Sequence, residues 1–208
     1  MDKFNQETES KIKQAAREVF IESGKDGARM NEIANRAGVN KALLHYYFRT
    51  KDLLFQHVLK DTLKEIIHGL MTIPTQVPFK EFLQTFIETH ISFVIKHSPI
   101  MSFALWEMRK NPDLIGSVIN EIKAELNIDP STLIRNRFQQ AIEKNEIRAV
   151  DPMQFTLNLV SLNIFPQLAK PMAISLYNIP EEQYEQILKD RKQIVFDLLW
   201  QYIKPENQ

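Results

Sequence analysis

A short run near the start of the sequence combines basic, small and aromatic side chains at positions that one helix presents to solvent. Its members surround the apolar Leu44 and are Lys41, Ala42, Leu43, His45, Tyr46 and Tyr47. Lysine, histidine and tyrosine donate hydrogen bonds to phosphate oxygens or base edges, and alanine or leucine contacts a thymine methyl group. The run is therefore typical of a helix that enters the major groove of DNA.

The residues before this run are those that a tight turn between two helices requires. Ile33 and Ala34 give the preceding helix an inner face. Gly38 falls where the turn needs a residue without a Cβ, and Val39 fills the corner. Asn40 can cap the second helix through its side-chain oxygen. Together with the longer helix that follows, the segment predicts a helix-turn-helix.

This segment resembles the N-terminal helix-turn-helix of the TetR family of bacterial transcription regulators. The matching residues, in register, are Ile33-Ala34, Ala37-Gly38-Val39, Asn40-Lys41, Tyr47-Phe48 and Thr50-Lys51-Asp52-Leu53. The resemblance covers roughly a quarter of the chain. It implies a DNA-binding module, followed by a helical body that binds a small effector and pairs with a second copy.

Two positions depart from the family pattern. Arg29 stands where the family usually has a capping threonine, so the first motif helix is expected to start late, near Asn31, and the guanidinium is available to a phosphate. Ala42-Leu43 and His45 stand where the family commonly has Gly-Thr and an aromatic residue. These groove contacts are less polar than the common family pattern, and they do not predict the operator sequence.

Residues of this segment are the expected DNA contacts. They are Arg29, Asn40, Lys41, Ala42, Leu43, His45, Tyr46, Tyr47 and Lys51. Tyr47 and Lys51 are expected at phosphates, because they lie beside the N-terminus of the next helix, which favours anions. Packing of the Tyr47 ring is an alternative role, and Lys41 is suited equally to a phosphate or a guanine edge.

The charge distribution supports this interpretation although the whole chain has a formal net charge of zero. Residues 25–51 hold six basic and two acidic side chains, a net charge of +4, so the remainder carries −4. A basic module on an acidic body is the pattern of a DNA-binding protein.

Other classes of protein are disfavoured by what the sequence lacks. It has no cysteine, which excludes disulfides and thiolate metal sites, and no G-x-S-x-G, P-loop or G-x-G-x-x-G motif. We expect no catalytic residue and no cofactor. The N-terminus lacks the apolar run of a signal peptide, and the longest uncharged stretch, residues 152–169, is too polar to cross a membrane. We therefore expect a soluble, cytoplasmic protein.

Apolar spacing along the chain predicts an all-α fold of about nine to ten helices, without sustained alternation. We assign residues 1–50 to a three-helix helix-turn-helix domain and residues 51–208 to a helical effector-binding and dimerisation domain. The fourth helix follows the motif with no flexible linker, so it joins the two parts.

Aromatic and histidine side chains gather on the helix expected near residues 78–97 and on the next one. The residues are Phe82, Phe86, His90, Phe93, His97, Phe103 and Trp106. Within a TetR-like body they predict a pocket for a small apolar or aromatic effector. An ordinary helix core with two hydrogen-bonded histidines fits equally well. No metal site is expected, because His90 and His97 lie about 10.5 Å apart along a helix.

The last two expected helices, 151–170 and 181–203, are unusually apolar for the end of a chain. Such a pair needs a cover, and a second copy related by a two-fold axis is the simplest one. Two paired modules also read a palindromic operator with higher effective concentration than one.

The sequence thus predicts a dimeric transcriptional regulator, a repressor that a small molecule releases from double-stranded DNA. Two alternatives stay open. One is a DNA-binding protein without a ligand switch, and the other is a helical module whose motif contacts protein.

Overall fold

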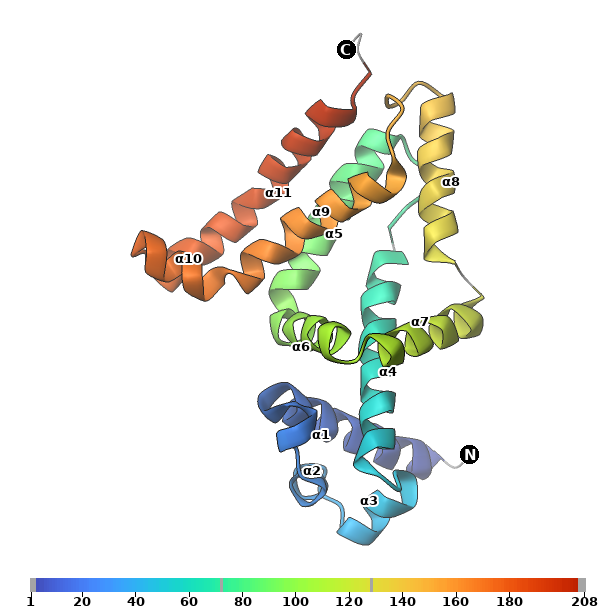
Figure 1. Ribbon diagram of the computed structural model, residues 1–208, viewed down its shortest axis with the longest axis vertical. Helices are drawn as coiled ribbons and strands as arrows, with labels where there is room; N and C mark the ends of the chain where they lie inside the picture. The colour runs from blue at the N-terminus through green and yellow to red at the C-terminus, as the bar shows by residue number, and fades with distance from the viewer. Residues whose placement is uncertain (1–2, 72, 128, 206–208) are drawn as a thin grey trace. The chain divides into compact units, whose positions relative to one another are not determined.

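Helices account for all the regular structure in the part of the chain that the structure describes (Figure 1). The structure is a computed structural model that describes residues 3–71, 73–127 and 129–205. Its elements are α1 (Lys3–Gly27), α2 (Met30–Arg36), α3 (Lys41–Tyr47), α4 (Lys51–Met71), α5 (Phe79–Lys96), α6 (Ser98–Lys110), α7 (Pro112–Leu126), α8 (Pro130–Glu143), α9 (Pro152–Leu168), α10 (Lys170–Tyr177) and α11 (Glu181–Ile203). The all-α class is confirmed. The eleventh helix arises because α10 is separate from α9, which the sequence pattern did not show.

Side chains of the expected types begin and end these helices. Asp151 Oδ1 accepts hydrogen bonds from the amides of Met153 and Gln154 at 2.7 and 3.2 Å, and Pro152 occupies the first turn of α9. Gly24, with φ 65°, interrupts α1 near its C-terminal end. Asparagines in the left-handed conformation follow three other helices, namely Asn127, Asn145 and Asn178.

The helices form two compact units. The first contains α1, α2, α3, α4 as far as Ile66, α6 from Pro99, and α7. Its core consists of buried apolar side chains from every one of these helices. They include Ile12, Val19, Phe20, Ile33, Leu44, Phe48, Leu54, Phe55, Leu59, Phe103 and Val118.

Ion pairs supplement this core along α4. Lys13 of α1 lies 2.8 Å from Asp61, and Lys60 lies 2.8 Å from Glu121 of α7. Each pair is partly exposed, so each contributes at most about 1 kcal/mol. They fix orientation more than they add stability, and α4 is thereby held to both α1 and α7.

The second unit contains the end of α4 from Ile67, then α5, α8, α9, α10 and α11. Helix α5 packs against α9 and α11, which run beside it in Figure 1. Its buried apolar residues recur at helical spacing, as the sequence predicts, and are Phe79, Leu83, Ile87, Ile91 and Val94. Helix α8 adds Phe138 and Ala141 to the same core.

Pro166 sits in the last turn of α9, and its effect is local. Proline has no N–H, so the carbonyl of Leu162 loses its helical donor. Arg191 of α11 donates to that carbonyl at 3.0 Å instead. The hydroxyl of Tyr184 donates to the carbonyl of Pro166 at 2.7 Å. Two side chains of α11 thus replace bonds that α9 cannot make and join the two helices.

A polar pair is buried where α5 meets α9. His90 is 3% exposed and Asn163 is 4% exposed. The side-chain amide of Asn163 donates to Nδ1 of His90 at 2.9 Å. Burial lowers the pKa of His90 from 6.5 to about 4, so the imidazole is neutral in the folded protein at pH 7.

The two units divide the chain differently from the functional boundary predicted at residue 50. Helices α6 and α7 pack in the same unit as the helix-turn-helix. The division into a DNA-binding part, 1–50, and an effector part, 51–208, concerns function and stays a prediction.

The buried His90 predicts acid-sensitive stability. Its pKa is lower in the folded chain than in the unfolded chain, so the unfolded state binds the proton first as the pH falls through 6.5. Stability present above pH 6.5 is lost progressively towards pH 4. Between pH 7 and pH 5 the loss should be roughly 2 kcal/mol. Urea unfolding at the two pH values measures it.

The variant His90→Gln should lose much less stability between these pH values, because it cannot take up the proton. His68→Gln is the matched control, since His68 is exposed. That control should keep the full dependence. Equal pH dependence in the wild type and His90→Gln would assign the effect to other groups.

Candidate nucleic-acid interface and ligand cavity

The turn between α2 and α3 depends on the backbone conformation of Gly38. Its φ is 66°, a left-handed value that other residues rarely adopt, while a Cβ built there would meet no atom within 4 Å. The requirement is therefore conformational and not steric. The amides of Gly38 and Val39 donate to the carbonyls of Asn35 and Ala34 at 3.1 and 3.0 Å, which closes the end of α2.

Helix α3 is fixed at both ends and along one face. Asn40 Oδ1 accepts a hydrogen bond from the amide of Leu43 at 2.8 Å, as the sequence predicts for a cap. Leu44 is fully buried and Phe48 nearly so. Thr50 then caps α4, accepting from the amide of Leu53 at 3.1 Å. A helix of only seven residues is thus held in one orientation.

The opposite face of α3 is open. Lys41, Ala42, His45 and Tyr46 are exposed, with Tyr46 at 75%, and Leu43 is half-buried. His45 Nδ1 lies 3.3 Å from the carbonyl of Arg49. The side chains that the sequence predicts for the groove therefore share one accessible face.

Two residues predicted at phosphates also make contacts within the protein. The hydroxyl of Tyr47 donates to Asn5 Oδ1 at 2.8 Å, and its ring lies edge-on to Tyr46 at 5.5 Å. The ammonium of Lys51 donates to the carbonyls of Asp26 and Ala28 at 3.3 and 3.1 Å. Both side chains help hold α1 to the motif, a role that sequence reasoning missed for Lys51.

Arg29 precedes α2 without capping it, and the helix begins at Met30, one residue earlier than expected. The Arg29 side chain is exposed. No ion pair is found for it among the residues that the structure describes. It is therefore positioned as a surface cation beside the motif.

Part of the predicted positive charge is neutralised within the protein. Arg36 binds Glu22 through both terminal nitrogens, at 2.7 and 2.6 Å, and Glu32 at 2.9 Å. The hydrogen bond from Arg36 lowers the pKa of Glu22. Lys25 pairs with Asp52 at 3.0 Å. Among the basic side chains of residues 25–51, those without such an acidic partner in the described part of the chain are Arg29, Lys41, Arg49 and Lys51.

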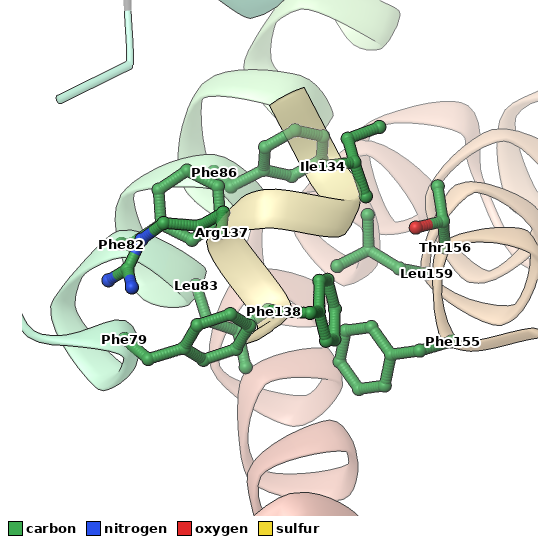
Figure 2. Close-up of a pocket in the computed structure, with 10 residues that line it drawn as sticks. All are labelled: Phe79, Phe82, Leu83, Phe86, Ile134, Arg137, Phe138, Phe155, Thr156 and Leu159. Carbon is green, nitrogen blue, oxygen red and sulfur yellow. The ribbon is translucent and has the colours of Figure 1, made fainter. Parts of the chain in front are cut away.

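The second unit contains an apolar cavity of about 40 Å³ between α5, α8 and α9 (Figure 2). Aromatic and aliphatic side chains form most of its lining. The lining residues are Phe79, Phe82, Leu83, Phe86, Ile134, Arg137, Phe138, Phe155, Thr156 and Leu159. Such a lining suits a small apolar ligand.

Arg137 is the charged residue of this lining, and it is nearly buried. Its Nη2 donates to the carbonyl of Val77 at 2.6 Å, and its guanidinium lies 5.1 and 5.2 Å from the ring centres of Phe79 and Phe82. Glu146 is 4.0 Å away. Burial lowers the pKa of Arg137, although the nearby Glu146 opposes this effect.

The residues predicted for an effector pocket fall into three groups. Phe82 and Phe86 line the cavity, and the ring of His90 lies 5.6 Å from that of Phe86 but outside the lining. Phe93 and His97 stack on each other at 4.4 Å. Phe103 and Trp106 belong to the first unit, where Phe103 packs against Phe55 and Trp106 is 64% exposed. The cavity therefore gathers only part of the predicted set.

Side chains of α8 and α9 complete the cavity, and sequence reasoning missed them. Phe138 and Phe155 face each other with ring centres 5.2 Å apart. Their helical spacing predicts a buried face but not the helix that they meet. No group of three metal-ligating side chains, and no helix suited to crossing a membrane, occurs in the described ranges.

Comparison with known proteins agrees with this geometry. Residues 12–58, which span the turn and α3, match the family model described as bacterial regulatory proteins, tetR family. This segment therefore matches the DNA-binding helix-turn-helix of the tetR family, at the N-terminal end where the sequence resemblance implies it.

Two curated relatives are transcriptional regulators of the helix-turn-helix type. The Bacillus subtilis protein named "Probable HTH-type transcriptional regulator YttP" is 27% identical over 183 residues, 85% of this chain and 86% of that protein. The transcriptional activator FasR of Mycolicibacterium smegmatis is 33% identical over 81 residues, 38% of this chain and 37% of FasR.

Solved structures share the fold over almost the whole of this chain. The regulator FadR of Bacillus subtilis, solved in complex with stearoyl-CoA, superposes with a TM-score of 0.65. The alignment covers 91% of this chain and 96% of FadR at 23% identity. A likeness at this identity shows the fold alone.

The left-handed Gly38 predicts a specific cost for adding a Cβ. Gly38→Ala should destabilise the first unit by about 1–2 kcal/mol, because alanine is strained at this φ. Thermal or urea unfolding of the purified protein measures the change.

Gly116 is the matched control, since it lies inside α7 of the same unit and a Cβ there also meets no atom within 4 Å. Gly116→Ala should stabilise by about 0.5–1 kcal/mol, because alanine favours helix. Opposite signs for the two variants are expected. If Gly38→Ala left the free energy of unfolding unchanged, the turn would tolerate another conformation.

Proposed function

We propose that this chain is a dimeric repressor that binds a palindromic DNA operator and is released from it by a small molecule. The observation that carries the proposal is the exposed face of α3, a helix that is capped at its start and whose opposite face is buried in the core. Lys41, Ala42, His45 and Tyr46 are exposed there, while Leu44 is buried beneath them. The proposed place of action is the cytoplasm, where the DNA of bacteria lies.

At the DNA, the proposed roles follow from chemistry and exposure. Lys41 and His45 meet phosphates or polar base edges, while Ala42 and Leu43 contact thymine methyl groups. Arg29 is an exposed cation for the flanking backbone. Beyond its contacts within the protein, Lys51 keeps a further N–H that can donate to a phosphate, whereas Tyr47 can donate to one only when its hydroxyl leaves Asn5. Asn40 positions α3 through its cap.

Pairing is proposed through an apolar surface on α9 and α11, here termed the terminal surface. It consists of exposed side chains on one side of each helix. They are Phe165, Leu168, Ile187, Ile194, Leu198 and Tyr202. A contiguous apolar patch of large side chains marks an interaction site, and a two-fold axis lets the same patch cover itself.

Control by an effector is proposed through the cavity of the second unit. The cavity supports it, as does the complex of the similarly folded FadR with stearoyl-CoA. Helix α4 runs from the first unit into the second, so a change in its course alters the spacing of two paired modules. These must lie about 34–36 Å apart to enter successive grooves. A coupling of about 3 kcal/mol would lower operator affinity about 150-fold.

One observation favours a second candidate, a regulator without a ligand switch. The cavity is only about 40 Å³, less than a typical drug-sized ligand requires. A constitutive DNA-binding protein needs no larger space. The two functions share the same DNA-binding face and differ in whether any ligand changes operator affinity.

The DNA-binding face is tested by removing one exposed charge. In a dimer, Lys41→Ala removes two phosphate or base contacts, so affinity for duplex should fall roughly tenfold or more near physiological salt. If both contacts are to phosphates, the salt slope should fall by about 2. Fluorescence anisotropy with generic duplex at several salt concentrations measures both quantities.

Lys189→Ala is the matched control, because Lys189 is an exposed lysine on α11 in the other unit. This variant should bind DNA like the wild type. Unchanged affinity in Lys41→Ala would remove Lys41 from the interface. Absence of salt-sensitive duplex binding in the wild type would favour a motif that contacts protein.

The terminal surface is tested by placing a charge at its centre. Leu198→Glu should convert the dimer to monomer at micromolar concentration, because pairing would bury two unpaired carboxylates. Sedimentation velocity measures the mass. Leu133→Glu changes an equally exposed leucine of α8 and should leave the dimer intact. A wild-type monomer, or a dimer that survives Leu198→Glu, would contradict this interface.

A further inference from the structure

The apolar cavity is not isolated, because a surface groove of about 340 Å³ shares part of its wall. The groove lies between the first turns of α8 and α9. Ile134 of α8 and Thr156 of α9 line both spaces. The two hollows therefore adjoin at this pair of side chains, and a ligand that occupies both must part them; this route is here termed the passage.

The inner end of this passage is suited to hydrocarbon. The hydroxyl of Thr156 already donates to the carbonyl of Pro152 at 2.7 Å. The guanidinium of Arg137 lies against Phe82, on the opposite side of the lining from Thr156 (Figure 2). Nε of Arg137 is buried without a partner, but away from this guanidinium a polar ligand group placed between the rings would lose its water without gaining a hydrogen bond, which is costly.

The volume of the cavity further limits which ligand groups can enter it. A space of about 40 Å³ holds about three water-sized spheres, at roughly 10–15 Å³ each. That space accommodates the slender end of an alkyl chain but not a ring. The remainder of such a ligand must lie in the groove, which is several times larger.

The groove offers a polar side chain for the other end of the ligand. Asp151 is engaged by two backbone amides, and the hydroxyl of Ser131 donates to Asp129 at 2.8 Å. Arg135 is exposed and has no acidic partner within the described ranges. The groove therefore presents a cation, which favours an anionic head group.

From this arrangement we infer that the two hollows bind one amphiphile with an unbranched acyl chain and an anionic head. The methyl end enters the aromatic cavity between Ile134 and Thr156, and the head remains at Arg135. A free carboxylate and an acyl thioester of an anionic carrier share this chemistry. The inference rests on the proposed effector control and names the class of effector.

The chain end is tested on the unmodified protein by calorimetry. Decanoate is compared with the same acid carrying a hydroxyl on its last carbon. The hydroxylated acid should bind about tenfold more weakly or worse, because its hydroxyl would be buried without a partner. Equal binding would overturn the inference, and this measurement needs no variant that might misfold.

The passage is tested by a pair of variants on α8. Ile134→Trp should fill the shared wall and lower decanoate affinity at least tenfold. Leu133→Trp adds the same ring at the neighbouring position, which is 52% exposed and lines neither space, and should leave affinity unchanged. If the two variants changed the decanoate affinity equally, or if neither changed it, the ligand would bind elsewhere.

The head group is tested with decanoate, decanol and decanoyl-CoA. In the wild type, decanoate should bind about fivefold more tightly than decanol, and Arg135→Gln should remove this preference. Lys144→Gln makes the same charge change just beyond the other end of α8 and should retain it. Tighter binding of decanoate or of decanoyl-CoA identifies the source of the chain. If neither decanoate nor decanoyl-CoA binds, the inference is wrong.

Operator affinity, measured in parallel, separates this inference from the proposed function. If decanoate binds as described and operator affinity does not change, the site stands and effector control fails. If a compound of another class lowers operator affinity equally in the wild type and Ile134→Trp, effector control stands and the site inferred here fails.

Discussion

A helix of seven residues does not persist alone in water, because its few hydrogen bonds do not offset the loss of backbone entropy. Helix α3 exists because Gly38 turns the chain, Asn40 caps the first turn and Leu44 with Phe48 buries one face. These four residues leave the other face little freedom to move. The DNA-binding face is therefore a consequence of what is buried beneath it, and a loss at the turn or the core displaces every outward side chain together.

Much of the positive charge in this unit is likewise engaged in contacts within the protein. A net charge of +4 over residues 25–51 suggests a strongly basic head, yet Arg36 is bound to Glu22 and Glu32, and Lys51 to backbone carbonyls. Few cations then remain for phosphates. One module of this kind supplies only a small electrostatic attraction to DNA, which supports the proposed pairing of two modules.

The sequence predicted what is set locally. The cap at Asn40 needs only neighbouring residues and is found as predicted, and the caps at Thr50 and Asp151 are equally local. Contacts between helices are different, because a period of 3.6 residues identifies a buried face without naming its partner. Phe82 and Trp106 looked alike in sequence, yet one lines a cavity and the other is exposed in a different unit.

The small volume of the cavity is compatible with the proposed effector control. A ligand that fits a preformed cavity without preferring either state shifts no equilibrium, however tightly it binds. In a space of about 40 Å³, a chain that extends beyond the first few carbons must separate Ile134 from Thr156 or displace a phenylalanine. The cost of that displacement lowers the observed affinity, and it also makes binding depend on the arrangement of α5, α8 and α9. Under the proposed effector control, tight packing around the cavity would be the source of a preference between states, and a roomier pocket would bind more readily while controlling less.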